Sequence, residues 1–192
     1  MTNGNGKATK EYIIYLDSSV LISFTEADSD SISELLSMCK AKNVVVRISP
    51  YTVMESLNIK QEHKYFMKKV SEGMALKKVI SNRRERDLTT QDLKGIFEVL
   101  RRKLKPHGME FFHYPLDANW WKLALDITRD SNVNSSDAIH LAQSVFMGCD
   151  LLVSTDNFFI ENGINFLKEY LKNEKLVICR PEKAVEILKV IS

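Results

Sequence analysis

The fold is decided by two neighbouring stretches of the sequence, SSDAIHLA at positions 135–142 and GCDLLVSTD at positions 148–156. The two serines are good helix N-caps, so a helix is predicted to begin there with Asp137 in its first turn. Leu151 to Val153 is a short apolar run typical of a buried parallel strand, and Asp156 follows its carboxyl end. The pattern therefore predicts a carboxylate at a helix start and another at a strand end, where ligands bind in α/β sheets.

Each of these acids also has an ordinary structural interpretation. An Asp in a first helical turn complements the helix dipole, and an Asp in a turn caps its own backbone. Function is indicated only when further acids occupy equivalent places. Asp17 does so, because it follows the apolar run Tyr12 to Leu16 and directly precedes a helix. Glu55 lies early in a helix that Ser49-Pro50 opens.

Short apolar strands alternate with amphipathic helices along most of the chain. Strands are predicted at 12–16, 44–48, 109–114, 151–153 and 176–179, and further helices at 31–40, after Asp117, at 164–171 and from Pro181 to Leu188. This alternation predicts an α/β fold of three α/β/α layers with a mostly parallel central sheet. We expect a disordered tail at 1–10 and a single domain at 11–192, with a basic helical insertion near 60–108.

The distribution of charge points to a polyanionic partner, although the net charge is only +2. Residues 56–108 hold 14 Lys and Arg against 6 Asp and Glu, so this segment carries +8 and the remainder −6. A basic segment on an acidic remainder suits a polyanion that an acidic site also has to approach. A solvated helix face or a contact in a homodimer is the alternative. The densest groups of cations are Arg83, Arg84 and Arg86, with Arg101, Arg102, Lys103 and Lys105.

Cysteine use and hydropathy exclude several other classes. Cys39, Cys149 and Cys179 are widely spaced and odd in number, so they indicate buried reduced thiols rather than disulfides or a zinc site. No apolar run approaches the ~20 residues of a membrane helix. We therefore expect a cytoplasmic protein without a membrane partner.

The four acids together predict a metal site. Asp17, Asp137 and Asp156 follow strands or open helices of one parallel sheet, and Glu55 lies near a helix start, so all four belong to the same edge. Carboxylates that lie so close together raise each other's pKa, and they need a cation to stay ionised together. Oxygen ligands of this kind indicate Mg²⁺ or Mn²⁺, and such ions assist the hydrolysis of phosphodiesters.

In these motifs the chain resembles the PIN-domain ribonucleases, a family that includes the toxins of many toxin–antitoxin pairs. The motifs are YLDSSVLI at 15–22, Glu55 after Ser49-Pro50, SDAIH at 136–140 and STDNFF at 154–159. The resemblance implies a PIN-like fold and metal-dependent endonuclease activity on single-stranded or structured RNA. It makes Asp17, Glu55, Asp137 and Asp156 the catalytic and metal-binding acids, with Ser19 and Ser154 as polar supports behind them. His140 is assigned to packing or orientation.

Three hypotheses follow. The first is an RNase, either a toxin with an antitoxin partner or an RNA-processing enzyme, whose basic segment binds the RNA backbone without reading bases. This segment is longer than in a minimal toxin of the family. The second is a PIN-like binding module without activity. The third, an aspartyl phosphatase, usually needs Asp-x-Asp at the first strand end, where this chain has Asp17-Ser18-Ser19.

Overall fold

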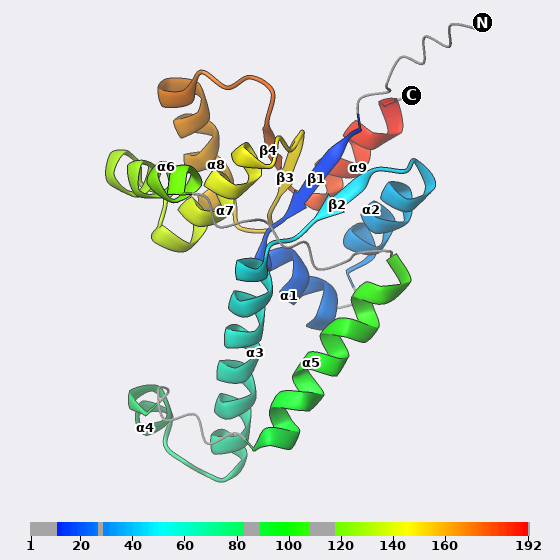
Figure 1. Cartoon of the computed structure of the whole chain (residues 1–192). Helices are drawn as coiled ribbons and strands as arrows, with labels where there is room; N and C mark the ends of the chain where they lie inside the picture. The colour runs from blue at the N-terminus through cyan, green and yellow to red at the C-terminus, as the bar shows by residue number, and fades with distance from the viewer. Residues whose placement is uncertain (1–10, 27–28, 83–88, 108–117, 192) are drawn as a thin grey trace, which may run out of the picture.

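A four-stranded parallel sheet organises the computed structural model, which describes residues 11–26, 29–82, 89–107 and 118–191 (Figure 1). The strands are β1 (Ile13–Leu16), β2 (Val45–Arg47), β3 (Leu151–Val153) and β4 (Val177–Cys179). Their order across the sheet is β2-β1-β3-β4, and every neighbouring pair is parallel. The predicted parallel sheet is thus confirmed. The strand expected at 109–114 lies outside the described residues, as do residues 1–10.

Alternate side chains of the strands enter two separate cores, one on each face of the sheet. Ile14, Leu16 and Val153 pack with helices α1 (Ser18–Glu26), α2 (Asp30–Ala41) and α9 (Pro181–Val190) on one face. Tyr15 and Leu152 point the other way. They pack with helices α6 (Ala118–Asp130), α7 (Ser135–Phe146) and α8 (Asn157–Phe166). Strand residues alternate between faces in this way, and two covered faces give the predicted α/β/α layers.

Helices α3 (Pro50–Ser71), α4 (Leu76–Ser81) and α5 (Thr90–Leu104) project from the sheet as a helical arm (Figure 1). Ser49 and Thr52 form a capping box at the start of α3, and Pro50 occupies its first turn, as the sequence predicts. Gly73 follows the end of α3 with a φ of 79°, a left-handed conformation that glycine adopts without strain. A short 3₁₀ turn, Lys105–His107, continues α5 toward α2.

Two helix boundaries differ from the sequence prediction. Helix α7 is capped by Asn134, whose side chain accepts a hydrogen bond from the backbone of Asp137, and not by a serine. The helix predicted at 164–171 begins earlier, at Asn157, because the Asp156 side chain caps it, and it continues into a π-helical turn at Leu167–Leu171. Asp and Asn compete with Ser for the cap position, so a run of such residues leaves the start of a helix ambiguous.

The strand order places a topological switch point between β1 and β3. The chain moves from β1 to β2 on one side, and later enters β3 on the other side of β1. Helices leave the two strands toward opposite faces, which opens a crevice at their carboxyl ends. Asp17 follows β1 and Asp156 follows β3, so both acids border this crevice.

The described cysteines agree with the prediction from the sequence. Cys39, Cys149 and Cys179 are buried and unpaired. Trp120 is buried in the core and Trp121 is half-exposed. None of the helices in the described ranges is both long and apolar enough to cross a bilayer.

We predict that Leu152→Ala lowers the free energy of unfolding by about 2–5 kcal/mol, because it removes a fully buried side chain from the central strand β3. Urea unfolding followed by circular dichroism measures this change. Leu125→Ala is the matched control, since Leu125 is 58% exposed on α6 and its loss should cost less than about 1 kcal/mol. Equal costs for the two variants would contradict the core described above.

Candidate active site

The carboxylate of Asp17 is held at the switch point by three serines. Its backbone N–H donates to the carbonyl of Val153 (3.0 Å), which ties the end of β1 to β3. Its Oδ2 accepts hydrogen bonds from the hydroxyls of Ser19 and Ser154, both at 2.7 Å, and its Oδ1 accepts one from the Ser18 N–H. Asp17 is 3% exposed, so these donors supply the partners that a buried carboxylate needs. Ser19 and Ser154, the two serines that the sequence analysis named, therefore both contact this carboxylate.

Glu55 reaches the same place from the second turn of α3. Its Oε1 accepts a hydrogen bond from the hydroxyl of Ser136 at the start of α7, and its Oε2 lies 2.7 Å from His140 Nε2. Burial alone would raise the pKa of the Glu55 carboxyl. The hydrogen bonds from His140 and Ser136 outweigh burial and lower this pKa to about 2.

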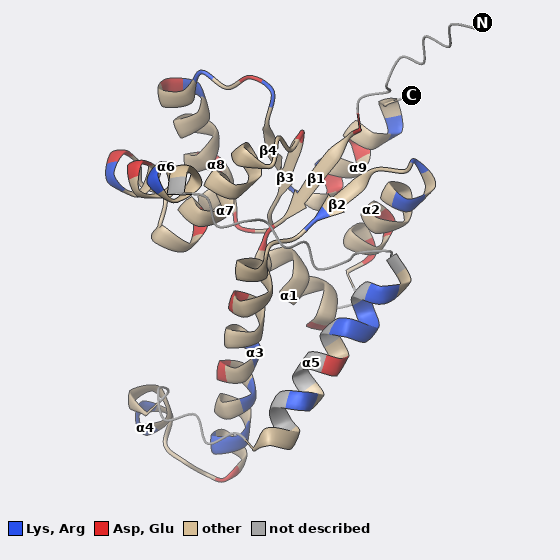
Figure 2. Ribbon diagram, in the orientation of Figure 1, with Lys and Arg blue, Asp and Glu red and all other residues tan. Residues whose placement is uncertain are grey.

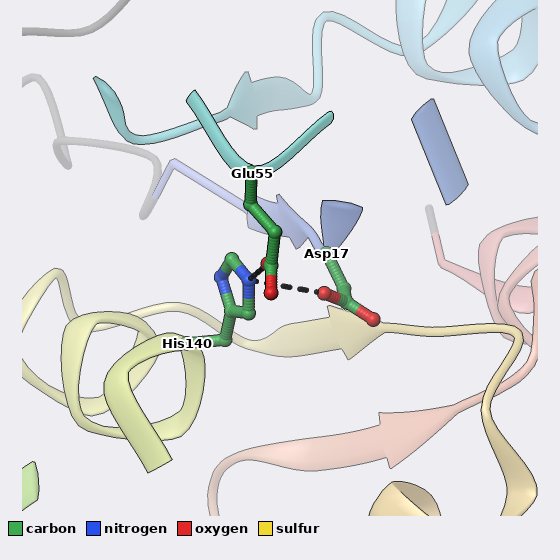
Figure 3. A group of neighbouring side chains, drawn as sticks. All are labelled: Asp17, Glu55 and His140. Atoms are coloured by element: carbon green, nitrogen blue, oxygen red, sulfur yellow. Dashed lines mark hydrogen bonds and ion pairs between the residues drawn. The ribbon is translucent and has the colours of Figure 1, made fainter. Parts of the chain in front are cut away.

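His140 joins the two acids (Figure 3). Its Nε2 lies 2.7 Å from Glu55 Oε2 and 3.2 Å from Asp17 Oδ1. A nitrogen between two carboxylates carries the proton, because ionised carboxylates only accept. Burial opposes a charge on this fully buried ring, yet the negative charge of Asp17 and the contact with Glu55 raise its pKa above the ordinary value. The imidazole thus separates two acids that would otherwise repel each other.

The other nitrogen of His140 is fixed by Tyr15, a buried residue of β1. Nδ1 lies 2.9 Å from the Tyr15 hydroxyl, which also contacts Ser49 and Thr52 of the α3 cap and Gln143 of α7, each within 3.0 Å. Burial raises the pKa of the Tyr15 phenol, so it stays protonated. When the ring is neutral, Nδ1 accepts from the phenol, and when it is charged, Nδ1 donates to it. Strand β1 and helices α3 and α7 are joined through this network.

Asp137 is coupled to the other predicted acids by charge. Asn134 holds it twice, accepting from its backbone N–H (3.0 Å) and donating to its Oδ2 (2.6 Å). Burial, and next the charge of Asp17, raise the pKa of the Asp137 carboxyl to about 7, and Asp156 and Glu55 add to the shift. A pKa displaced this far by burial together with neighbouring acids is typical of functional sites.

Asp156 lies at the exposed border of the group. Its Oδ1 accepts hydrogen bonds from the backbone of Phe158 (2.8 Å) and Phe159 (3.2 Å), so it caps α8. Its own N–H donates to the hydroxyl of Ser154, which also holds Asp17. Asp156 therefore has the ordinary structural role of a helix cap, and it also lies at the carboxyl edge of the sheet, as Asp17 does.

The described residues include one group of side chains suited to a metal ion, formed by Asp17, Glu55 and His140. One ligand atom from each lies within 4.8 Å of the others. Sequence reasoning named the two acids as ligands and gave His140 a role in packing or orientation. It missed Tyr15, Ser136 and Asn134. The spacing of Ser136 and His140, four residues apart on one helix, was a usable signal, because it puts both side chains on the same face.

Four of the predicted cations lie in or just after the last turn of α5. Arg101, Arg102 and Lys105 are exposed near the end of α5, beside α2 and across α1 from the start of α3 (Figures 1 and 2). The Lys103 ammonium lies 5.7 Å from the centre of the Phe24 ring on α1. Arg83, Arg84 and Arg86 lie outside the described residues. Within the described ranges, then, these cations do not share the edge that carries Asp17.

We predict that Asp137→Asn stabilises the metal-free fold in a pH-dependent way. The carboxyl titrates near 3.8 when ordinary and near 7 in the fold. Between these values the folded chain binds more protons than the unfolded chain, so its stability falls as pH rises, and the penalty is complete above pH 7. Asp137→Asn removes this penalty. It should therefore raise the free energy of unfolding by about 1–3 kcal/mol at pH 8, after allowing for solvent screening, and by less than about 0.5 kcal/mol at pH 4.

Urea unfolding in chelator at the two pH values measures this gain. Asp30→Asn is the matched control, because Asp30 is an exposed acid in the first turn of α2. It should lose a few tenths of a kcal/mol of dipole stabilisation and gain nothing at pH 8. A loss of stability in Asp137→Asn at pH 8 would show that Asp137 serves its helix alone.

Comparisons with known proteins complete the description of the site. No protein-family model matches the chain, and no curated protein matches it. Among solved structures, it is similar to a chain in the crystal structure of VapBC2 from Rickettsia felis bound to a DNA fragment from their promoter. The two share 13% sequence identity and superpose with a TM-score of 0.49, over 88% of this chain and 98% of that one.

Proposed function

We propose that this chain is a metal-dependent endoribonuclease that hydrolyses phosphodiester bonds in RNA. The observation that carries the proposal is the cluster of Asp17, Glu55 and His140 at the switch point of the sheet, to which Asp137 is coupled by charge. The motifs shared with the PIN-domain ribonucleases supply the reaction and the class of substrate. The same chemistry serves a toxin with an antitoxin partner and an RNA-processing enzyme.

The residues present fit a hard divalent cation. Asp17 and Glu55 offer carboxylate oxygens close together. Burial, and next the charge of Asp17, raise the pKa of Asp137, and a bound cation would favour its ionised form. We assign Asp17, Glu55, Asp137 and Asp156 as ligands for Mg²⁺ or Mn²⁺. When bound, the ion supplies an activated water and charge neutralisation at the phosphate.

The roles of the surrounding side chains follow from their contacts. Ser19 and Ser154 orient Asp17, and Ser136 orients Glu55, so each carboxylate presents a fixed face. His140 keeps Asp17 and Glu55 together by sharing its Nε2 proton with them. Outer partners of this kind set the geometry of metal ligands.

A second candidate is a PIN-like nucleic-acid-binding module without activity. The contacts of His140 favour it, because its Nε2 engages both Asp17 and Glu55 directly and competes with a cation for their oxygens. Incubation of a labelled single-stranded RNA with the purified chain, with Mg²⁺, with Mn²⁺ and with chelator, separates the two. Cleavage that depends on the metal supports the enzyme, and binding without cleavage supports the module.

We predict a graded loss of cleavage across the site. Asp17→Asn keeps the shape of the side chain but removes a ligand charge, and should lower the rate by more than about a hundredfold. Ser154→Ala removes the hydroxyl shared by Asp17 and the Asp156 backbone and should lower it by about 10–100-fold. Initial rates of RNA cleavage in Mn²⁺ measure both. Asp30→Asn on α2 is the control and should keep full activity. Full activity in Asp17→Asn would contradict the assignment of Asp17 as a metal ligand.

The ends of the products form a separate prediction. We expect 5′-phosphate and 3′-hydroxyl ends, because in the metal-assisted hydrolysis proposed here water would attack the phosphorus and the 3′-oxygen would be the leaving group. Attack by the 2′-hydroxyl would need a histidine or another base free to take its proton. The histidine of this site, His140, is fully buried and its Nε2 is engaged by two carboxylates. Mass spectrometry of the fragments tests this, and a 2′,3′-cyclic phosphate would contradict it.

A further inference from the structure

Arg180 brings a positive charge to the carboxyl edge of the sheet, where the acids gather. It follows β4 directly, as Asp17 follows β1 and Ser154 follows β3. The Ser154 N–H donates to the carbonyl of Cys179 (3.1 Å), which joins the end of β3 to the residue before Arg180. Among the residues that immediately follow the four described strands, Arg180 is the basic one. Its position therefore comes from the topology that also places Asp17.

The place of Arg180 at the start of α9 is unfavourable for the helix. It occupies the N-cap position, where Ser, Thr, Asp or Asn is preferred, and its side chain makes no cap hydrogen bond. A cation at a helix N-terminus is also opposed by the helix dipole. Glu182 offsets part of this, with its Oε2 at 3.8 Å from Arg180 Nε. A residue that breaks the local rule in this way is expected where function requires it.

Asn157 holds the guanidinium of Arg180 at the start of α8. Arg180 NH1 donates to Asn157 Oδ1 at 2.6 Å, and Asn157 directly follows Asp156 at the start of α8. The contact bridges helices on opposite faces of the sheet, because α8 packs in one core and α9 in the other. The cation is thus fixed one residue from a predicted metal ligand, and it remains exposed.

The next residue adds an aromatic surface. Phe158 is 58% exposed in the first turn of α8, whereas its neighbour Phe159 is fully buried. An exposed ring gains nothing from the core of its own chain. Proteins that bind single-stranded nucleic acids combine aromatic faces, on which bases stack, with cations that follow the phosphates. The guanidinium fork of Arg also matches the oxygens of a phosphate.

We propose that Arg180, oriented by Asn157, binds a backbone phosphate of single-stranded RNA beside the active site, and that Phe158 stacks an adjacent base. The proposal rests on the proposed function for the identity of the substrate. Arg180 and Phe158 are positioning residues for the RNA. An acidic protein segment could pair with the charge of Arg180, but its carboxylates would not stack on the exposed ring of Phe158. RNA accounts for both side chains.

Fluorescence anisotropy of a short labelled single-stranded RNA in chelator tests the site apart from cleavage. Arg180→Ala should raise Kd about tenfold and reduce the slope of log K against log salt by about 0.7, the value for one phosphate contact on a single strand. Phe158→Ala should raise Kd about tenfold and leave the salt slope unchanged, because stacking releases no counterions. The two residues are exposed, so their variants keep the fold, which thermal melting verifies.

Matched controls come from the same chain. Lys189 lies at the other end of α9 and pairs with Glu34, so Lys189→Ala removes a cation of the same helix and should leave Kd and the slope unchanged. Trp121 is a half-exposed aromatic residue of α6, and Trp121→Ala should also leave Kd unchanged. If the control variants lost as much RNA affinity as Arg180→Ala and Phe158→Ala, the proposed site would be overturned in favour of non-specific binding.

Cleavage measured in parallel separates this proposal from the proposed function. If the wild-type chain cleaves RNA while Arg180→Ala retains its Kd and slope, the site is overturned and the nuclease stands. If RNA binding depends on Arg180 and Phe158 but no metal supports cleavage, the site stands and the nuclease is overturned. A wild-type chain that binds no RNA, or Arg180-dependent binding of polyglutamate in place of RNA, would overturn the site.

Discussion

The contact of His140 Nε2 with the carboxylates of Asp17 and Glu55 is the interaction on which the site depends. Bringing two ionised carboxylates together away from water is costly unless a cation or a proton donor lies between them. The imidazole supplies that donor, and Tyr15 fixes its orientation from the strand that carries Asp17. Residues far apart in the sequence are thereby held in one arrangement.

The sheet also fixes the position of Asp17. Ile14 and Leu16 anchor β1 in one core while Tyr15 faces the other, so the strand that ends in Asp17 is held on both faces. Because β1 and β3 are neighbours at a switch point, Asp17 and Ser154 emerge side by side and form a hydrogen bond. The position of the acids is thus a consequence of strand order, and their spacing is set by serines and by His140.

The sequence was sufficient for features that depend on local chemistry. Apolar runs located all four described strands, and the cap at Ser49-Pro50 located the start of the helix that carries Glu55. It failed where several residues compete for one local role, so Asn134 and not a serine caps α7, and α8 begins at Asn157. The network through Tyr15 and His140 was also missed. A hydrogen bond between residues 125 positions apart leaves no periodic trace in the sequence.

The distance of each cation from the acidic edge of the sheet limits what that cation can do. Salt screens charges beyond about 8 Å at physiological ionic strength, so a cation steers a polyanion from afar only weakly but positions it strongly on contact. Arg101 and Arg102 are exposed in the last turn of α5, across α1 from the start of α3, so under the proposed function we expect them to attract RNA rather than to position it at Asp17. Placement has to come from groups on the acidic edge itself. Arg180 is the proposed source of that placement, because its hydrogen bond to Asn157 holds it at the start of α8, next along the chain to Asp156.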